Sequence, residues 1–578
     1  MQTTRPPFRS RGHLISTDHN LATMAGLRIL EQGGNAADAG VAAGLCLNVV
    51  VPESANFGGV APVMFGPGDG KPVETISGLG RWPKAASIQH FMERHDGDMP
   101  EGLPRTVTPA APDAWLSALA RWGTMTFEEV VQPALELARD GRPVDERFYK
   151  ALQTPSIRTH ATTASTFLPE GEPVPVGQLF LQPDLANTFQ RMIDAERGRA
   201  GDRTQGLRAA RDLIYKGDIA QEIAEFHKRQ ESLLTYEDLA DFTVMVEVPE
   251  TIRYRDLEVN SCGPWCQGPS LLMALNILEG LDLKAMGHNS GDYLHVLLET
   301  LKLVFADREA YFGDPGFVNV PMQGLLHAEY ANRRRQWIDP DQAAPSMPPC
   351  GDPWHFEPDR QSAPARKVPA PAGNSGADGK LPWESDTTYL CVVDGQGNAF
   401  SATPSDGIGG AAVVPGLGFP ISHRGTQSWL DPDHASSLMP GKRPRLTPNP
   451  ALARRNGRPY MPFGCPGGDA QVQGMLQVFL NIVEFGMDPQ TAIEAARVIT
   501  HSFPNSFWPH ITLDGVVTVE TRIAAEARSA LRTKGHILEE DGEWSGSVSR
   551  VCAITVDSET GILTGGADPR TTAYAAGW

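Results

Sequence analysis

A strand-like run begins directly behind a segment that cannot fold on its own. Residues 347–382 are dense in proline, glycine, alanine and charge, a composition that buries too little apolar surface to become ordered. Thr387 and Thr388 then open a β-branched apolar run that ends at Asp394. A turn signal at 394–398 leads into a second strand-like segment, 399–403. We predict a buried hairpin that begins at Thr387, behind a flexible tether spanning residues 347–386.

This junction has a chemical interpretation as well as a structural one. If the chain is cut between Asp386 and Thr387, Thr387 carries a free α-amine beside its own hydroxyl, which is the arrangement of an N-terminal nucleophile. An α-amine with a pKa of about 8 is partly neutral at pH 7 and can accept the hydroxyl proton. Two threonines at the head of a strand also reflect ordinary β-propensity, so the pair alone does not establish a nucleophile.

The bulk properties favour an enzyme acting on small molecules. A net charge of −19 over 578 residues argues against a nucleic-acid partner and against an anionic membrane surface. The seven cysteines lack zinc-type pairing, so we expect reduced thiols and no metal or other cofactor. No apolar leader follows the N-terminus, and the longest apolar run, residues 39–51, is shorter than the roughly 20 residues of a membrane span. These features predict a soluble, cytoplasmic protein.

Periodicity indicates several helices around the hairpin. Residues 17–51 are typical of two helices, with Gly33 and Gly34 ending the first and Asn35 capping the second. Apolar spacing predicts further helices at 127–138, 269–278 and 293–305, and a final hairpin is expected at 551–568.

A glycine pair precedes another predicted helix, 470–484. Gly467 and Gly468 would place two unobstructed backbone N–H groups at the positive end of that helix, where an oxyanion of acyl transfer could be bound. A glycine pair before a helix is also consistent with a simple tight turn.

Spaced motifs in a consistent order decide between these interpretations. The chain resembles the γ-glutamyltransferase family of N-terminal-nucleophile hydrolases nearly from end to end. The resemblance rests on Gly33–Ala39 (GGNAADA), Val131–Ala134 (VQPA), Ala306–Arg308 (ADR), Gly313–Pro315 (GDP), Thr387–Thr388, Val392–Asp394 (VVD), Pro466–Gly468 (PGG) and Ala567–Arg570 (ADPR). Several motifs in family order are far more specific than any one of them.

The resemblance implies a fold, a processing event and a mechanism. The fold is α+β, a four-layer αββα sandwich. The precursor cuts itself before Thr387 into chains of residues 1–386 and 387–578, which stay together as a heterodimer; whether that heterodimer dimerises further is left open. Thr387 then attacks an amide carbonyl to form an acyl-enzyme, with Gly467 and Gly468 as the oxyanion glycines. Ser405 falls where the family has a threonine that supports the nucleophile.

The pocket departs from the γ-glutamyl pattern. Gly407 stands where the family has an asparagine, and Leu446–Thr447 replaces a serine pair. An α-ammonium would then lack its acidic partner, which disfavours glutathione as a substrate. The substrate-binding candidates are Arg81, Arg424, Gln427 and Asp469.

The two arginines suggest a different substrate. Arg81 and Arg424 can each hold a carboxylate in bidentate fashion, although Arg81 can equally stack on its neighbour Trp82, and Arg424 can equally bond backbone carbonyls. The pattern from Pro415 to Gly425, with Asp469 after the glycines, resembles the branch that includes oxamate amidohydrolase and other acylases. His423 has no place in this mechanism and is predicted to be a structural or rim residue.

Three hypotheses follow. The first is a cofactor-free amidohydrolase, self-processed at Thr387, that acts on a small carboxylate-bearing amide resembling oxamate. The second retains γ-glutamyl hydrolysis or transfer, as in glutathione hydrolases, or a cephalosporin-type acylase activity. The third is an unprocessed, inactive homologue that serves as a binding protein, for which Gly407 is the main argument.

Overall fold

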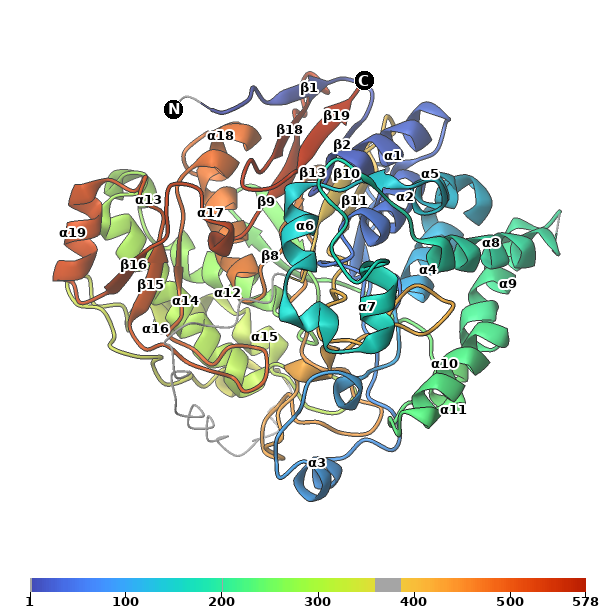
Figure 1. Ribbon diagram of the computed structural model, residues 1–578. Coiled ribbons are helices and arrows are strands. Elements are labelled where there is room, and N and C mark those ends of the chain that lie inside the picture. The colour runs from blue at the N-terminus through green and yellow to red at the C-terminus, as the bar shows by residue number, and fades with distance from the viewer. Residues whose placement is uncertain (1–2, 200, 359–385) are drawn as a thin grey trace.

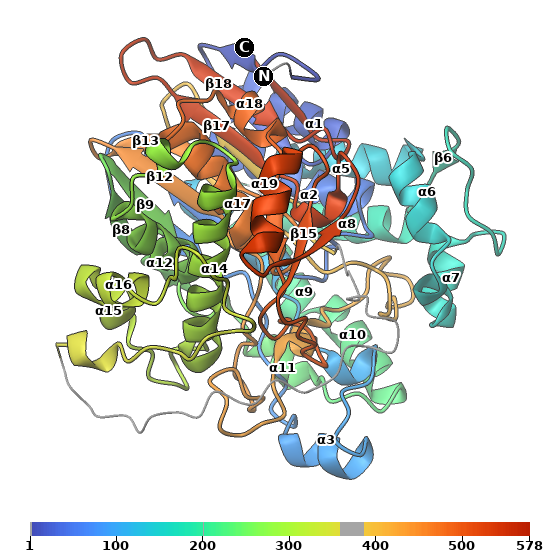
Figure 2. The same cartoon turned by 90° about the vertical axis from the view of Figure 1, so that its left-hand side faces the viewer.

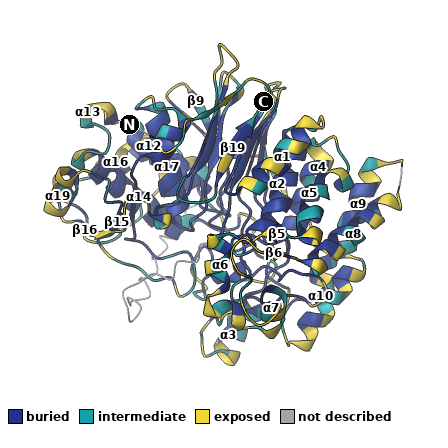
Figure 3. Cartoon of the chain, turned by 45° about the horizontal axis from the view of Figure 1, so that its top comes forward, coloured by how far each residue is buried: buried dark blue, intermediate teal, exposed yellow. Residues whose placement is uncertain are grey.

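Two seven-stranded sheets pack face to face between two groups of helices in the computed structural model, which describes residues 3–199, 201–358 and 386–578. The strands lie in the centre of the molecule and are largely buried, with helices on both sides (Figures 1 and 3). This arrangement confirms the predicted α+β, four-layer αββα architecture. Figure 2, turned by 90°, shows α12, α14 and α17 in front of the strands.

The strand order of each sheet shows which parts of the chain it joins. The first sheet runs β1 (Phe8–Ser10), β18 (Leu563–Ala567), β17 (Cys552–Val556), β13 (Arg458–Gly464), β12 (Ala451–Arg455), β9 (Leu257–Ser261), β8 (Glu250–Tyr254). The second runs β19 (Tyr574–Gly577), β2 (Leu14–Thr17), β10 (Leu390–Val393), β11 (Ala399–Ala402), β3 (Val63–Gly66), β4 (Glu74–Ile76), β7 (Val246–Glu247). All neighbouring strands within these two sheets are antiparallel.

Helices form the outer layers. The group beside the second sheet consists of α1 (Asn20–Glu31), α2 (Ala36–Val50), α4 (Ala111–Trp122), α5 (Phe127–Asp140), α8 (Pro183–Arg197), α9 (Arg203–Tyr215), α10 (Asp218–Arg229) and α11 (Tyr236–Ala240). The group beside the first sheet consists of α12 (Gly268–Glu279), α14 (Gly291–Tyr311), α16 (Ala328–Arg335), α17 (Ala470–Val483), α18 (Pro489–Glu494) and α19 (Ala525–Thr533). None of the helices in the described ranges has the length and apolar character needed to span a membrane.

Smaller elements complete the chain. Two further sheets contain β14 (Val498–Thr500), β15 (Val516–Val519) and β16 (Ile537–Glu540), and β5 (Arg142–Pro143) with β6 (Leu179–Phe180). The remaining short helices are α3 (Ile88–Arg94), α6 (Glu146–Leu152), α7 (Ala161–Phe167), α13 (Leu283–Met286) and α15 (Met322–Leu325).

The first two helices confirm the sequence prediction. The Asn35 side chain accepts hydrogen bonds from the first turn of α2, and the Asp38 carboxylate accepts one from the Asn35 backbone N–H, which completes a capping box. The small residues of α2 allow close packing on the second sheet: a Cβ at Gly40 would lie 2.3 Å from the Phe400 ring. Helix α2 is buried along its whole length.

The predicted hairpin is the centre of the second sheet. Strands β10 and β11 pair antiparallel, and β10 lies between β2 and β11. The final hairpin is also confirmed, as β17 and β18. Each sheet therefore contains strands from both sides of the predicted cleavage point, so two processed chains would share both hydrogen-bonded ladders.

The first residues of the predicted tether are held by contacts. Gly351 donates its N–H to the Asp307 carboxylate at 2.8 Å and accepts from the Tyr311 hydroxyl at 2.7 Å. Residues 354–356 form a 3-10 turn. Side chains of α14 supply partners that composition did not reveal; residues 359–385 of the predicted tether lie outside the described part of the chain.

Candidate active site

The hairpin register brings Thr387 and Ser405 together. Leu390 pairs with Ala402, and the same register continued past the end of the strands pairs Thr387 with Ser405. Their hydroxyl oxygens lie 2.8 Å apart, and both residues are fully buried. Thr387 and Ser405 are eighteen positions apart in the sequence, and this separation places them opposite each other across the hairpin.

Asp386 and Arg424 form an ion pair at the bond before Thr387. The Arg424 guanidinium donates to the Asp386 carboxylate at 2.7 Å and to the Asp386 carbonyl oxygen at 3.0 Å, and it also donates to the Ser405 hydroxyl. Arg424 lies in a 3-10 turn, Arg424–Gln427, and is fully buried. The alternative in which Arg424 bonds a backbone carbonyl describes a contact that it makes. Its carboxylate contact is with Asp386 of the same chain, and binding of a substrate carboxylate stays a prediction.

Asp406 is a site residue that the sequence analysis missed. Its backbone has φ of +85°, a conformation unusual for a residue with a side chain, and its N–H donates to the Asp386 carbonyl oxygen at 3.0 Å. The Ser422 hydroxyl donates to its carboxylate, and His423 Nδ1 lies 3.2 Å from the same group. The signal available was the Asp406–Gly407 dipeptide, which is typical of turns that use this backbone region.

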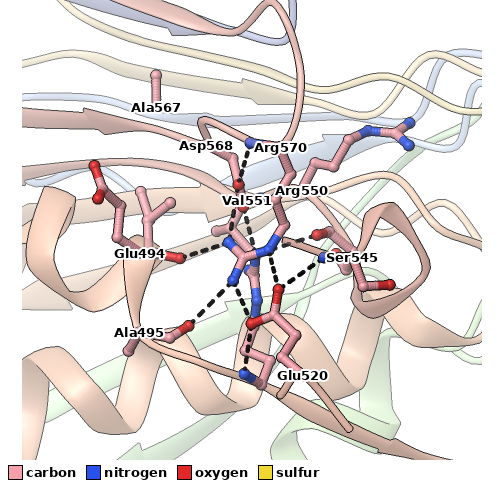
Figure 4. A network of polar contacts seen from close by, with 12 residues as sticks. Glu494, Ala495, Glu520, Ser545, Arg550, Val551, Ala567, Asp568 and Arg570 are labelled. Carbon is pink, nitrogen blue, oxygen red and sulfur yellow. Dashed lines mark hydrogen bonds and ion pairs between the residues drawn. The ribbon is translucent and has the colours of Figure 1, made fainter. Parts of the chain in front are cut away.

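Arg550, which precedes β17 of the first sheet, approaches Thr387. Its Nη2 donates to the Thr387 carbonyl oxygen at 3.4 Å. The following residue, Val551, donates its N–H to the Asp568 carboxylate at 3.0 Å, and Arg570 donates to Asp568 at 3.0 Å and to Glu520 at 2.6 Å (Figure 4). The family motif that contains Asp568 and Arg570 therefore holds the start of β17, from which Arg550 reaches Thr387.

This buried network depends on ionised carboxylates. Burial works to raise the pKa of Asp568, but the neighbouring guanidinium groups of Arg570 and Arg497 outweigh it and lower the pKa to about 2. Asp568 is fully buried, so its charge is compensated only by these partners.

The glycine pair forms a turn between β13 and α17. Gly467 and Gly468 have φ of +125° and +54°, and their carbonyls accept hydrogen bonds from Ala470 and Gln471. Within the described ranges, neither of their own N–H groups donates to a protein acceptor. Gly468 lies beside the Phe507 ring, over which the Arg424 guanidinium lies at 5.4 Å, so the turn faces the same region as Arg424.

Gln427 lies next to this turn. Its side-chain N–H donates to the Thr447 hydroxyl at 2.9 Å, and Gln267 bridges the Thr447 and Gly468 carbonyl oxygens at 2.8 and 2.9 Å. Gln427 is fully buried, and its Oε1 accepts no hydrogen bond from the described residues. Its predicted contact with substrate stays a prediction.

Arg81 and Asp469 have other partners. The Arg81 guanidinium lies 6.0 Å from the Phe242 ring centroid, so the aromatic partner is not the neighbouring tryptophan. Asp469 accepts from Arg308 at 2.5 Å and from the hydroxyl and N–H of Ser506 at 2.6 and 2.8 Å. Three internal donors favour a role for Asp469 in holding the glycine turn, and substrate binding by Arg81 or Asp469 stays untested.

Crowding of the backbone explains why position 407 is a glycine. A Cβ at this position would lie 2.3 Å from the Glu53 carbonyl oxygen and 3.3 Å from the Asp386 Cβ. An asparagine side chain therefore has no room here without a backbone shift. The absence of the amide follows from the close approach of residue 53.

A cavity of about 750 Å³ opens beside the Asp386–Thr387 bond. Asp386, Gly407, His423 and Arg550 are among its lining residues, together with residues of α6 and of the segment after it, between 146 and 157. Its volume is in the range of small-molecule sites. His423, predicted as a structural or rim residue, lies between this cavity and the Asp406 carboxylate.

A buried threonine paired with a second hydroxyl across a hairpin, together with a glycine turn at a helix N-terminus, is the arrangement of an N-terminal-nucleophile hydrolase. The family described as Gamma-glutamyltranspeptidase matches residues 22–578, and the chain belongs to this family of amidohydrolases and acyltransferases.

Individual relatives include a hydrolase and an acylase. The chain is 29% identical to the glutathione hydrolase proenzyme of Bacillus subtilis (strain 168), over 98% of this chain and 91% of that protein. It superposes on the solved structure of LmbA2991HD with a TM-score of 0.91 at 35% identity, over the full length of both chains. The cephalosporin acylase of Bacillus halodurans gives a TM-score of 0.85 at 29% identity, covering 100% of this chain and 98% of that one.

Proposed function

We propose that the chain cleaves itself between Asp386 and Thr387 and then acts as an N-terminal-threonine amidohydrolase on a small carboxylate-bearing amide resembling oxamate. The large chain is residues 1–386 and the small chain residues 387–578, and they remain one heterodimer because both sheets contain hydrogen-bonded strands of each chain. Neither a metal nor another cofactor is needed for this chemistry.

In the processed enzyme, the free α-amine of Thr387 accepts the proton of its own hydroxyl. The Thr387 oxygen attacks the carbonyl carbon of the substrate amide, and the N–H groups of Gly467 and Gly468 stabilise the resulting oxyanion. The amine leaves with the proton and an acyl-enzyme remains. Water then attacks the ester and releases the acid.

The observation that carries the substrate assignment is the Arg424–Asp386 ion pair. Arg424 holds a carboxylate at 2.7 Å while the same nitrogen donates to the hydroxyl partner of the nucleophile, Ser405. Cleavage turns Asp386 into a chain end that can move away. A carboxylate of the substrate then takes its place beside the Arg424 guanidinium, which keeps the Asp406 carboxylate, 3.5 Å from its Nε, as an internal partner.

Two other functions have support from relatives. The glutathione hydrolase proenzyme of Bacillus subtilis favours γ-glutamyl hydrolysis or transfer, and the Bacillus halodurans structure favours a cephalosporin-type acylase. Against the first of these, Gly407 has no room for the amide side chain that the family uses there. The inactive-homologue alternative is countered by the paired hydroxyls of Thr387 and Ser405, which a binding protein does not require.

Two assays test the proposal. A purified chain that remains a single 62.5 kDa band after long incubation excludes the enzyme. With processed protein, ammonia release from oxamate is compared with aniline release from a γ-glutamyl anilide and with acid release from a glutaryl amide. Turnover of the anilide or the glutaryl amide without turnover of oxamate contradicts the small-amide assignment and favours the corresponding alternative.

A further inference from the structure

The oxygen of the bond to be cut is already surrounded by donors. The Asp386 carbonyl oxygen accepts from the Asp406 N–H at 3.0 Å, from the Arg424 guanidinium at 3.0 Å and from the Ser405 hydroxyl at 2.5 Å. A peptide carbonyl has two lone pairs, which the Asp406 N–H and the Ser405 hydroxyl can fill. Arg424 Nη2 has two hydrogens and three acceptors within reach, so its donation to this oxygen strengthens when negative charge develops there. The three donors match the greater capacity of an oxyanion.

We propose that the Asp406 N–H and Arg424 form a second oxyanion hole, used for self-cleavage and separate from the Gly467–Gly468 turn. This proposal rests on the proposed self-processing. It adds two residues that act on the reacting atoms of the precursor, and it assigns Arg424 a task before any substrate is bound.

The single hydroxyl hydrogen of Ser405 determines in which direction a proton can move between Thr387 and Ser405. Ser405 has one hydroxyl hydrogen, which it donates to the Asp386 carbonyl oxygen, and it accepts from Arg424. The contact of 2.8 Å with Thr387 must then be donated by Thr387. The Thr387 proton can therefore pass to Ser405 as the Ser405 proton passes to the carbonyl oxygen.

The steps balance without an external base. As the Thr387 oxygen bonds to the Asp386 carbonyl carbon, negative charge develops on the former carbonyl oxygen, and the Asp406 N–H and Arg424 stabilise it in the transition state. The relay then completes the transfer of the Ser405 proton to this oxygen, which gives a neutral tetrahedral intermediate. This intermediate collapses as the carbon–nitrogen bond breaks, and its hydroxyl proton moves to the departing Thr387 nitrogen. Water hydrolyses the resulting ester, which yields the Asp386 α-carboxylate and a free Thr387 hydroxyl.

The strained backbone of Asp406 supports this assignment. Its φ of +85° turns the N–H toward the Asp386 carbonyl, and its carboxylate is held by Ser422 and lies 3.5 Å from Arg424 Nε. A non-glycine residue in this conformation persists only where its surroundings enforce it. One side chain thus holds both donors of the proposed hole in place.

The test follows cleavage of pulse-labelled full-length chain on a gel. We expect Arg424→Met to slow cleavage by about 100-fold, the usual effect of removing one oxyanion donor. Asp406→Gly keeps the N–H and the backbone conformation, so it should remain within about 10-fold of the unmodified chain, whereas Asp406→Ala should be slower than Asp406→Gly. A purely structural role of the carboxylate predicts equal rates for the Gly and Ala variants.

Controls separate this proposal from misfolding and from failure of processing itself. Arg334→Met removes another buried arginine paired with an aspartate, Asp307 at 3.2 Å, and should leave the rate unchanged in folded protein. Hydroxylamine, which cleaves esters, should not accelerate Arg424→Met, because the block precedes the ester.

The outcomes that overturn the proposal are distinct. Unmodified chain that never cleaves overturns self-processing and this inference together. If the unmodified chain and folded Arg424→Met cleave at the same rate, the second oxyanion hole alone is overturned. Rescue of Arg424→Met by hydroxylamine has the same consequence. If Arg424→Met does not fold, as judged by thermal melting, equal rates of Asp406→Gly and Asp406→Ala overturn it.

Discussion

Ser405 lies directly across the hairpin from Thr387, with their hydroxyl oxygens 2.8 Å apart and no solvent access to either residue. Ser405 also touches Arg424 and the Asp386 carbonyl oxygen. One hydroxyl thus contacts the Thr387 hydroxyl, the Arg424 guanidinium and the Asp386 carbonyl oxygen, and this relationship makes the predictions below specific.

Replacement of Ser405 tests the hydroxyl itself. We expect Ser405→Ala to slow self-cleavage by about 100-fold, because general acid–base partners typically contribute this much. Ser405→Thr keeps the hydroxyl and should retain most of the rate. The measurement is the half-life of the 62.5 kDa precursor on a gel. Equal half-lives for the Ala and Thr variants would show that the hydroxyl takes no part.

The two adjacent threonines should behave differently. Thr387→Ala should leave a stable precursor, because the attacking oxygen is gone. The Thr388 hydroxyl instead donates to the Asp18 carboxylate at 3.2 Å, so Thr388→Ala should lose only this hydrogen bond, about 1–3 kcal/mol of stability, and still cleave. N-terminal sequencing of the small chain identifies the cut, and a product that begins at residue 388 would move the nucleophile by one position.

An asparagine at position 407 should not restore a γ-glutamyl site. The Glu53 carbonyl oxygen lies 2.3 Å from the position of a Cβ at Gly407, so Gly407→Asn should force the backbone apart and lower the free energy of unfolding by about 1–3 kcal/mol. Gly546→Asn, at an exposed glycine with nothing within 4 Å of its Cβ position, is the matched control. Denaturant unfolding measures both; a stable Gly407→Asn protein that hydrolyses γ-glutamyl anilide would contradict this expectation.

Stability should fall in acid because of Asp568. Its pKa is about 2 in the folded protein against an ordinary 3.8, so the folded state binds the proton less readily than the unfolded state. The stabilisation is fully present above pH 4 and is lost as the pH falls through 2. It amounts to about 2 kcal/mol at neutral pH by linkage.

Asp568→Asn tests this assignment. It should destabilise the protein by about 3 kcal/mol at pH 7, because it removes the carboxylate paired with the buried Arg497 guanidinium and one of the two carboxylates paired with Arg570. It should also flatten the pH dependence of unfolding between pH 4 and 2, measured by denaturant titration at each pH. Parallel pH profiles for the variant and the unmodified protein would assign the acid sensitivity to other carboxylates.

Local patterns were sufficient to predict the elements that surround the site. The glycine pair at 33–34, the Asn35 cap and the apolar spacing of α12, α14 and α17 predicted helices that the structure confirms. The hairpin was predicted from its β-branched runs and its turn, and once its register is known the pairing of Thr387 with Ser405 follows from position alone. These features depend on neighbours along the chain, so the sequence contains them directly.

The partners of the site residues depended on the tertiary structure. Arg424 and Asp386 are separated by 38 positions, and Arg550 and Thr387 by 163, so no local pattern indicates that they meet. The φ of Asp406, the crowding at Gly407 and the internal donors to Asp469 are likewise set by segments that approach from elsewhere in the chain. The sequence alone determined the family and the fold and predicted Thr387 as the nucleophile, because these follow from motifs and periodicity. Only the packing of the two sheets decided which charges face the bond, because burial and partner choice are properties of the folded chain.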